Sequence, residues 1–199
     1  SLDPVGRTVS MLSLPRDLYV ELADGMGRAR INIAIQRGGA PLLIRTIAKN
    51  FGIEVNHYVQ VDFASFRGLV DAIDGVPVPI PYPARDKQTG LDIPAAGCVT
   101  LDPVQALAYV RSRHYEERKR GRWVQDLSSD IGRIQRQQDF IRRSLHRAID
   151  RGARNPGTLD QLIDIGLAGI TVDSELTADD ILEVGSRFRS FDPDGLTTY

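Results

Sequence analysis

The 199-residue sequence has one cysteine, Cys98, and only three histidines. A single cysteine excludes an internal disulfide and a multi-cysteine metal site, and the histidines do not follow a metal-ligand spacing. No uncharged apolar run approaches about 18 residues, so none of these residues is expected to form a membrane-spanning helix. The motifs GxGxxG, GxxxxGK[ST] and GxSxG are absent, which removes the usual support for a dinucleotide-binding protein, a P-loop NTPase or a serine hydrolase.

Lysine is scarce, because only 3 of the 25 basic side chains are lysines. Basic residues are also concentrated: residues 111–147 hold 11 Arg and Lys against 5 Asp and Glu, whereas the other residues hold 14 against 21. This segment is suited to meet negative charge. The planar guanidinium fork matches phosphate geometry, but a GC-rich genome also favours arginine, so composition leaves both explanations open.

Hydrophobic periodicity and turn residues predict alternating strands and helices. Strands are expected at residues 7–14, 18–22, 57–61 and 170–172, and the alternate prolines of residues 75–83 predict an edge strand or an extended arm. Helices are expected at 30–37, 41–51, 63–73, 104–113, 130–151, 156–167 and 177–188, and a polar basic loop at 114–129. The order indicates an α/β fold with a layered α-β-α arrangement, a central mixed sheet and helices on both faces. We expect one domain over residues 1–199, apparently cropped at both ends.

The longest expected helix has three kinds of face. Four apolar residues share an arc of about 60° and are expected to form its buried stripe: Ile134, Ile141, Leu145 and Ala148. Three polar residues lie on the adjoining arc, at the edge of the core: Asp130, Arg133 and Gln137. An arginine at such an edge needs an anionic partner, which could be Asp130 at i, i+3 or a bound ligand. A solvated face is expected for Arg136, Arg143 and Arg147.

Further arginines lie where elements end. Arg111 and Arg113 finish the preceding helix, where cations either stabilise the helix dipole or form a clamp for phosphate oxygens together with Arg133. Arg16 follows an expected strand, and strand ends are where ligands bind in open α/β sheets.

Several blocks of the sequence, in order over residues 7–150, resemble the LytR-CpsA-Psr family: SLPRDLYVEL, RARINIAIQRGG, HYVQVDFASFRGLVDAIDGVPV, LDPVQALAYVRSRH and SSDIGRIQRQQDF. The resemblance implies a membrane-anchored, extracytoplasmic phosphotransferase of the cell wall, facing the peptidoglycan. Such an enzyme moves a glycopolymer with its linking phosphate from a polyprenyl-pyrophosphate carrier to peptidoglycan. The membrane anchor is expected in a segment absent from this chain. An older label of the family is cell envelope-related transcriptional attenuator.

The resemblance also implies site residues. The pyrophosphate-binding positions match Arg16, Arg30, Arg111, Arg113, Arg133 and Gln137, with Arg30 standing where the family often has lysine. Asp130 and Arg133 are the expected catalytic residues, and Asp130 is a candidate magnesium ligand or proton acceptor. The family's further Mg²⁺-binding aspartate is expected on a strand before the printed residues. A lipid carrier also needs an apolar slot, which the helices at 41–51, 63–73 and 131–149 could border.

Two other functions remain open at the level of sequence. A binding-only or hydrolytic protein would keep pyrophosphate recognition without transfer. A nucleic-acid-binding attenuator would use the basic segment, but no recognition-helix pattern is visible and the pI is near 6.3, so no nucleic-acid partner is expected. The identity of the glycopolymer does not follow from the sequence.

Overall fold

The computed structural model describes residues 2–3, 8–153, 170–187 and 190–199. These residues form two compact units. Unit 1 comprises residues 1–12, 61–171 and 177–199, and unit 2 comprises residues 13–60 and 172–176. A single domain can itself contain two compact units, so the expectation of one domain over residues 1–199 stays a prediction.

Unit 2 is built on a hairpin and a broken helix. Strand β3 (Tyr19–Glu21) pairs antiparallel with β4 (Arg28–Arg30), and α1 (Asn32–Phe51) follows. The predicted interruption of this helix is confirmed, because Gly38 and Gly39 have non-helical backbone angles and Gly39 has a φ of 63°. Only glycine adopts that conformation without strain. Strand β5 (Val59–Val61) pairs with β12 (Ile170–Val172), and Asp173 accepts a hydrogen bond from the backbone N–H of Tyr58.

Two helices of unit 1 begin with an aspartate cap. Asp62 caps α2 (Phe63–Ala72) by accepting a hydrogen bond from the N–H of Ser65. Asp102 caps α3 (Pro103–Arg111), with its carboxylate accepting from two backbone N–H groups and Pro103 in the first turn. Aspartate at the cap satisfies donors that have no partner within the helix, and proline tolerates the first turn. Together these helices present Val70, Tyr109 and other apolar residues to one core.

The strands of unit 1 fall into small sheets. Two of the alternate prolines, Pro77 and Pro79, lie on β6 (Val76–Ile80). Among the described strands β6 pairs only with β9 (Gly97–Leu101), in a two-stranded sheet, so the predicted edge strand is confirmed. A four-stranded sheet has the order β11-β10-β7-β8. Its strands are β7 (Ala84–Asp86), β8 (Leu91–Ile93), β10 (Glu116–Lys119) and β11 (Arg122–Gln125).

The prediction of a loop over residues 114–129 was wrong. Residues 116–125 form the β10–β11 hairpin, which turns at Arg120 and Gly121, both with positive φ. Its strands lack apolar alternation, so periodicity does not reveal them. Contacts from other strands hold them instead: Arg85 forms an ion pair with Glu116 and stacks over the ring of Trp123.

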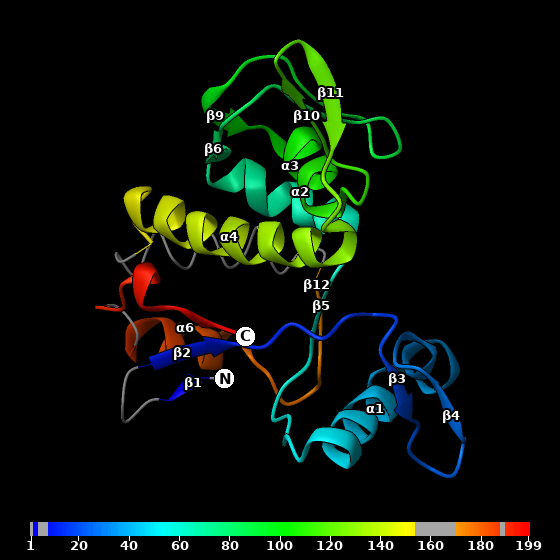
Figure 1. Cartoon of the computed structure of the whole chain (residues 1–199). Coiled ribbons are helices and arrows are strands. Elements are labelled where there is room, and N and C mark those ends of the chain that lie inside the picture. Colours follow the sequence, from blue (N-terminus) through cyan, green and yellow to red (C-terminus); the bar gives the residue numbers. More distant parts are fainter. Residues whose placement is uncertain (1, 4–7, 154–169, 188–189) are drawn as a thin grey trace. The chain divides into compact units, whose positions relative to one another are not determined.

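Helix α4 (Ser129–Asp150) lies along α3 and β6 (Figure 1). Its predicted buried stripe is confirmed only in part, because Ala148 packs against the core and Ile134 is half-buried but the other two members are exposed. Phe140 is buried and stacks on Phe66 of α2, whereas Ile141 and Leu145, expected to be buried, are 43% and 37% exposed.

The arginines expected on a solvated face of α4 are half-buried, so that prediction was wrong as well. Arg147 donates to the backbone carbonyls of Ile73 and Asp74, and Arg143 pairs with Asp139. Their aliphatic stems can be covered because the charged ends find carbonyl and carboxylate oxygens.

The remaining described elements complete unit 1. Strand β2 (Thr8–Met11) pairs antiparallel with β1 (Leu2–Asp3) and parallel with β13 (Thr197–Thr198), which gives a mixed three-stranded sheet. Helix α6 (Ala178–Arg187) and the 3-10 turn η1 (Pro193–Gly195) follow in sequence. The helix expected at 156–167 lies outside the described residues. The α/β fold class is confirmed, with its strands in several small sheets.

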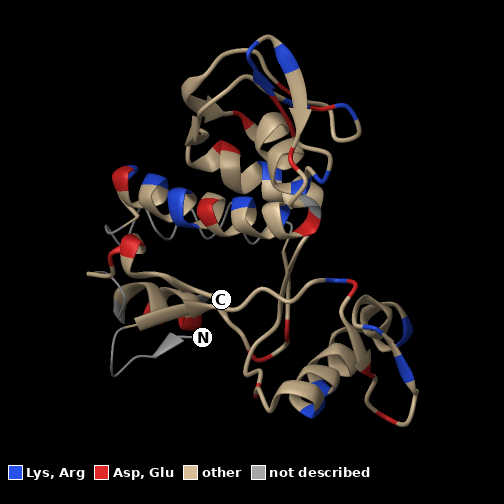
Figure 2. Ribbon diagram, in the orientation of Figure 1, with Lys and Arg blue, Asp and Glu red and all other residues tan. Residues whose placement is uncertain are grey.

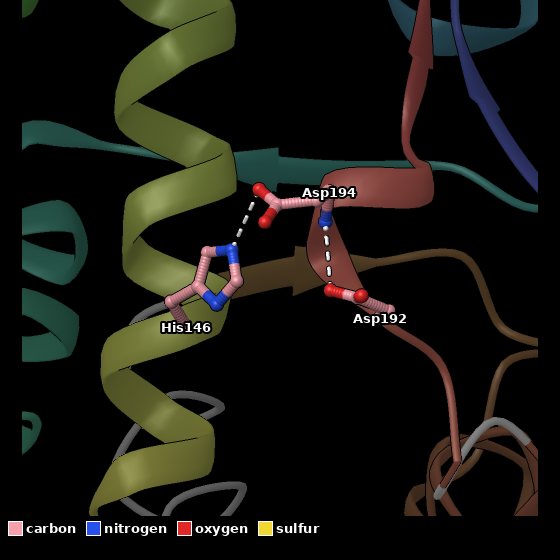
Figure 3. A group of neighbouring side chains, drawn as sticks. All are labelled: His146, Asp192 and Asp194. Carbon is pink, nitrogen blue, oxygen red and sulfur yellow. Dashed lines mark hydrogen bonds and ion pairs between the residues drawn. The ribbon is translucent and has the colours of Figure 1, made fainter.

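The 3-10 turn is attached to α4 by a hydrogen-bond contact between His146 and Asp194. His146 Nε2 lies 3.0 Å from Asp194 Oδ1, and the carboxylate of Asp192 accepts from the N–H of Asp194 (Figure 3). Pro193 and Leu196 are buried beside this pair. None of the helices in the described part of the chain has both the length and the apolarity needed to cross a bilayer.

Candidate functional site

An arginine cluster lies at the start of α4, and we define it as Arg113, Asp130 and Arg133. Asp130 Oδ1 lies 2.7 Å from Arg133 Nη2 and 3.1 Å from Arg113 Nη2. The i, i+3 ion pair considered from the sequence is therefore present, and it recruits Arg113 from the end of α3 as well. Figure 2 shows basic and acidic residues side by side at this end of α4. One carboxylate thus holds two guanidinium groups together, and the planar guanidinium group matches the geometry of phosphate oxygens.

Arg111, the last residue of α3, makes a different contact. Its guanidinium carbon lies 4.3 Å from the ring centroid of Phe63, the first residue of α2. Both side chains are exposed, and Phe63 has 55% of its surface accessible. A guanidinium stacked on one aromatic face is held in orientation while its N–H edge still reaches outward.

Gln137 connects the two helices behind the cluster. Its side-chain amide donates a 2.9 Å hydrogen bond to the backbone carbonyl of Val110, in the last turn of α3. Carbonyls in the last turn of a helix lack intrahelical partners, so this bond satisfies one of them. Its expected role in orienting a diphosphate stays a prediction.

Arg136 fixes the segment between the two helices, a role that the sequence did not reveal. It donates 2.6 Å to the carbonyl of Ser112, pairs with Asp126 at 3.2 Å, and stacks over Tyr115. Only 10% of its side chain is exposed. Burial acts to raise the pKa of Asp126, but hydrogen bonds from Ser128 and the positive charge of Arg136 outweigh it, so the pKa lies below its usual value.

Asp86 is the second residue that sequence reasoning missed. Its carboxylate is fully buried and accepts from the hydroxyl of Ser112 at 2.6 Å and from the N–H groups of Arg113 and His114 at 3.2 and 3.0 Å. A further bond comes from the N–H of Gln88. An aspartate followed by turn-forming residues resembles any surface turn, so no sequence signal distinguishes it.

The remaining predicted arginines lie in unit 2. Arg16 and Arg30 both pair with Asp17, at 3.9 and 3.3 Å, and both side chains are more than half exposed. The N–H of Asn32 donates to the carbonyl of Arg16, which places Arg16 beside the start of α1. The structure thus brings together Arg16 and Arg30 in one unit and the arginine cluster in the other.

An exposed apolar stripe runs along α4, and we define it as Ile131, Ile141 and Leu145. These side chains are 67%, 43% and 37% exposed. Ile131 and Leu145 share a side of the helix because 14 residues make about four turns, and Ile141 lies one turn before Leu145. The stripe starts in the same turn of α4 as Asp130 and Arg133, with Ile131 about 100° around the helix from Asp130.

The described residues do not on their own fit a magnesium site at the arginine cluster. Mg²⁺ takes six oxygen ligands in near-octahedral geometry, and Asp130 Oδ1 already contacts two cationic nitrogens. Only one group of three candidate ligand residues occurs in the described part of the chain, His146 with Asp192 and Asp194. It lies about 24 Å along α4 from Asp130, at 1.5 Å per residue.

Comparison with known proteins identifies relatives of the whole chain. The LytR_cpsA_psr family model matches residues 1–199. The polyisoprenyl-teichoic acid–peptidoglycan teichoic acid transferase TagV of Bacillus subtilis is 30% identical over an alignment of 188 residues, which covers 89% of this chain and 44% of TagV. The chain therefore spans less than half the length of this relative.

Two further matches have different descriptions. The regulatory protein MsrR of Staphylococcus aureus is 32% identical over 141 residues, covering 70% of this chain and 39% of MsrR. A solved structure of a LytR-Csp2A-Psr enzyme from Actinomyces oris superposes with a TM-score of 0.81 at 30% identity, covering 96% of this chain and 70% of that chain.

Proposed function

The chain belongs to the LytR-CpsA-Psr family, and from this premise we propose that it carries the catalytic part of a phosphotransferase. Its donor is a glycopolymer linked through pyrophosphate to a polyprenyl carrier, and its acceptor is peptidoglycan. TagV is named for such a transfer of teichoic acid, which supports the reaction class for this chain.

One observation carries the proposal: the arginine cluster lies where the exposed apolar stripe of α4 begins. A polyprenyl diphosphate combines a dianionic or trianionic head with a long apolar tail. Arg113 and Arg133 meet the charge of the head, while Ile131 and the residues beyond it offer apolar surface to the tail. Charge and apolar surface in this order fit that ligand better than they fit a free phosphate.

The proposed reaction is a displacement at the glycan-linked phosphorus. An acceptor sugar hydroxyl forms a new P–O bond, the bond from this phosphorus to the bridging oxygen breaks, and polyprenyl phosphate leaves with the electron pair. The hydroxyl proton passes to a carboxylate, for which Asp130 is the candidate. The guanidinium groups of Arg113 and Arg133 offset charge on the leaving phosphate, which is how positioned cations accelerate phosphoryl transfer.

Three finer features are part of the proposal. Arg111 contributes a further contact to the diphosphate, and Gln137 orients it, while a diphosphate-binding role of Arg16 and Arg30 stays a prediction from the resemblance. The protein acts outside the cytoplasm and is attached to the membrane. Magnesium dependence follows from the resemblance alone, and no step is assigned to the ion because Asp130 does not fit it unaided.

A transfer assay tests the proposal. The protein is incubated with an undecaprenyl-pyrophosphate-linked teichoic acid precursor and peptidoglycan, with and without Mg²⁺, and polymer attached to peptidoglycan is measured together with released undecaprenyl phosphate. Arg133→Ala should abolish attachment, while Arg118→Ala on the exposed β10 strand serves as the matched control and should retain it. Release of undecaprenyl phosphate without attachment of polymer would instead identify a hydrolase. The absence of both release and attachment would contradict the proposal.

A regulatory function is the second candidate, since MsrR is named a regulatory protein and residues 111–147 are basic. Many cations of that segment are already engaged, including Arg133, Arg136 and Arg143 with aspartates. Retention of duplex DNA by the protein at physiological salt would favour a regulator, because nonspecific phosphate contacts are screened under those conditions.

A further inference from the structure

Asp86 is hydrogen-bonded to the segment that carries Arg113. Its Oδ2 accepts hydrogen bonds from the Ser112 hydroxyl and from the backbone N–H groups of Arg113 and His114, and its Oδ1 accepts from Gln88. The carboxylate comes from β7, 26 residues before Ser112 in the sequence. One buried group therefore determines the backbone direction at the residue whose side chain enters the arginine cluster.

The opposite side of the same segment is also held. The carbonyl of Ser112 accepts 2.6 Å from Arg136 of α4, while the N–H groups of the next two residues point to Asp86. The backbone between α3 and β10 is thus fixed on its donor side by a carboxylate and on its acceptor side by a guanidinium. The Arg113 side chain then has a defined origin from which to reach Asp130 at 3.1 Å.

The ionised form of Asp86 is the form that this arrangement selects. Burial acts to raise the pKa of Asp86, but the hydrogen bonds donated by Ser112, His114 and Gln88 outweigh it, so the pKa lies below its ordinary value. A buried carboxylate that gave no benefit would be costly compared with an apolar residue. Here its oxygens satisfy backbone donors at a sharp exit from a helix, which an apolar side chain could not do.

We propose that Asp86 is a positioning residue that holds the backbone of Arg113 so that its guanidinium meets Asp130 and, with Arg133, receives a diphosphate. This inference rests on the proposed function for the identity of the ligand. Asp86 itself is fully buried, so its carboxylate is not accessible from the surface. Its effect on binding therefore passes through Arg113.

The first test needs no ligand. Amide hydrogen exchange of Arg113 and His114 is measured in the protein and in Asp86→Asn, which keeps the shape but replaces one acceptor oxygen with a donor. We expect hydrogen exchange at both amides to accelerate about tenfold or more. In the variant these amides no longer donate to an ionised carboxylate, so the local opening that precedes exchange costs less free energy. Asp92→Asn, on the exposed side of the neighbouring strand β8, is the control and should change neither amide. Unchanged exchange in Asp86→Asn would overturn the proposal.

The second test uses geranyl diphosphate as the probe in calorimetric titrations. Asp86→Asn should weaken binding about tenfold, the equivalent of one charge-assisted contact. In a double-mutant cycle, Asp86→Asn should add no further loss to Arg113→Ala, whereas its loss should add fully to that of Arg111→Ala. Additive losses with Arg113→Ala would overturn the proposal, because they would show that Asp86 acts independently of that side chain.

A second variant and the binding of the unsubstituted protein complete the tests. If Asp86→Asn does not fold, Ser112→Ala removes one of the bonds to Asp86 and should weaken binding by a smaller factor of about three. Failure of the unsubstituted protein to bind geranyl diphosphate would overturn the proposed ligand and so the proposed function, whereas the exchange rates would still decide whether Asp86 positions Arg113.

Discussion

The guanidinium of Arg136 donates a hydrogen bond of 2.6 Å to the backbone carbonyl of Ser112. Ser112 is fully buried, and 10% of the Arg136 side chain is exposed. A residue that helical periodicity places on a solvated face is thus part of the support behind the arginine cluster. Arg136 is also more deeply buried than Arg143 on the same helix, so loss of Arg136 should destabilise the fold more.

Arg136→Ala should lower the free energy of unfolding by about 2–3 kcal/mol, because it leaves the Ser112 carbonyl and Asp126 without their buried partner. Arg143→Ala is the matched control on the same helix. It removes a partly exposed i, i+4 pair with Asp139 and should cost about 0.5 kcal/mol or less. Urea denaturation of both variants measures the difference, and equal losses would contradict the structural role assigned to Arg136.

Arg111→Ala should reduce the affinity for geranyl diphosphate about tenfold without changing the melting temperature measurably. The side chain is exposed and stacks on the exposed Phe63, so its loss removes a charged donor and little buried surface. Calorimetric titration and a thermal melt on the same preparation check both halves. A large fall in the melting temperature would show that Arg111 is structural instead.

Substitutions on the apolar stripe should affect long lipids more than short ones. Ile141→Asn and Leu145→Asn should each weaken binding of undecaprenyl diphosphate about fivefold, since each removes part of the apolar contact with the tail. Binding of geranyl diphosphate, whose tail is shorter, should change little. Val104→Asn on α3, where Val104 is 62% exposed, is the control. Equal effects on both lipids would place the tail elsewhere.

The stability of the protein should depend on the ionisation of Asp86. Its folded-state pKa lies below the unfolded value of about 3.9, so the carboxylate contributes stability above that pH and loses it as the pH falls through the folded-state pKa. Asp86→Asn cannot ionise, so the gap in unfolding free energy between the two proteins should be largest at neutral pH. The gap should narrow below about pH 4, which urea titrations from pH 7 to pH 3 would measure. A gap independent of pH would contradict this account.

Two glycines should respond to alanine in opposite directions. Gly75 has a φ of 75°, and a Cβ there would meet Thr100 Cγ2 at 2.8 Å and the Leu101 carbonyl oxygen at 2.9 Å. Gly75→Ala should therefore cost about 2 kcal/mol or more. Gly68 lies inside α2 with open space around its Cα, and Gly68→Ala should stabilise by about 0.5–1 kcal/mol. Thermal or urea unfolding of the two variants distinguishes these signs.

Local chemistry determined much of the fold from the sequence alone. Asp102 with Pro103 predicts the start of α3, the apolar spacing from Phe63 onward predicts α2, and the Gly38–Gly39 pair predicts the break in α1. The prolines at alternate positions predict an edge strand because proline cannot donate to a second neighbour. The pairing of Asp130 with Arg133 also follows from spacing, since residues at i and i+3 are neighbours on a helix.

Tertiary structure decided the partners of the polar groups. Periodicity gives the angle of each side chain around α4 but not which side other elements cover, so Ile141 was expected to be buried and Arg136 exposed, and the structure has the reverse. Asp86 reaches Ser112 only because β7 and the end of α3 meet in space. Hydrogen bonds between groups distant in the sequence depend on packing. The sequence therefore identified the arginines that we propose to bind a diphosphate, whereas the packed structure identified the groups that hold the backbone of Arg113 in place.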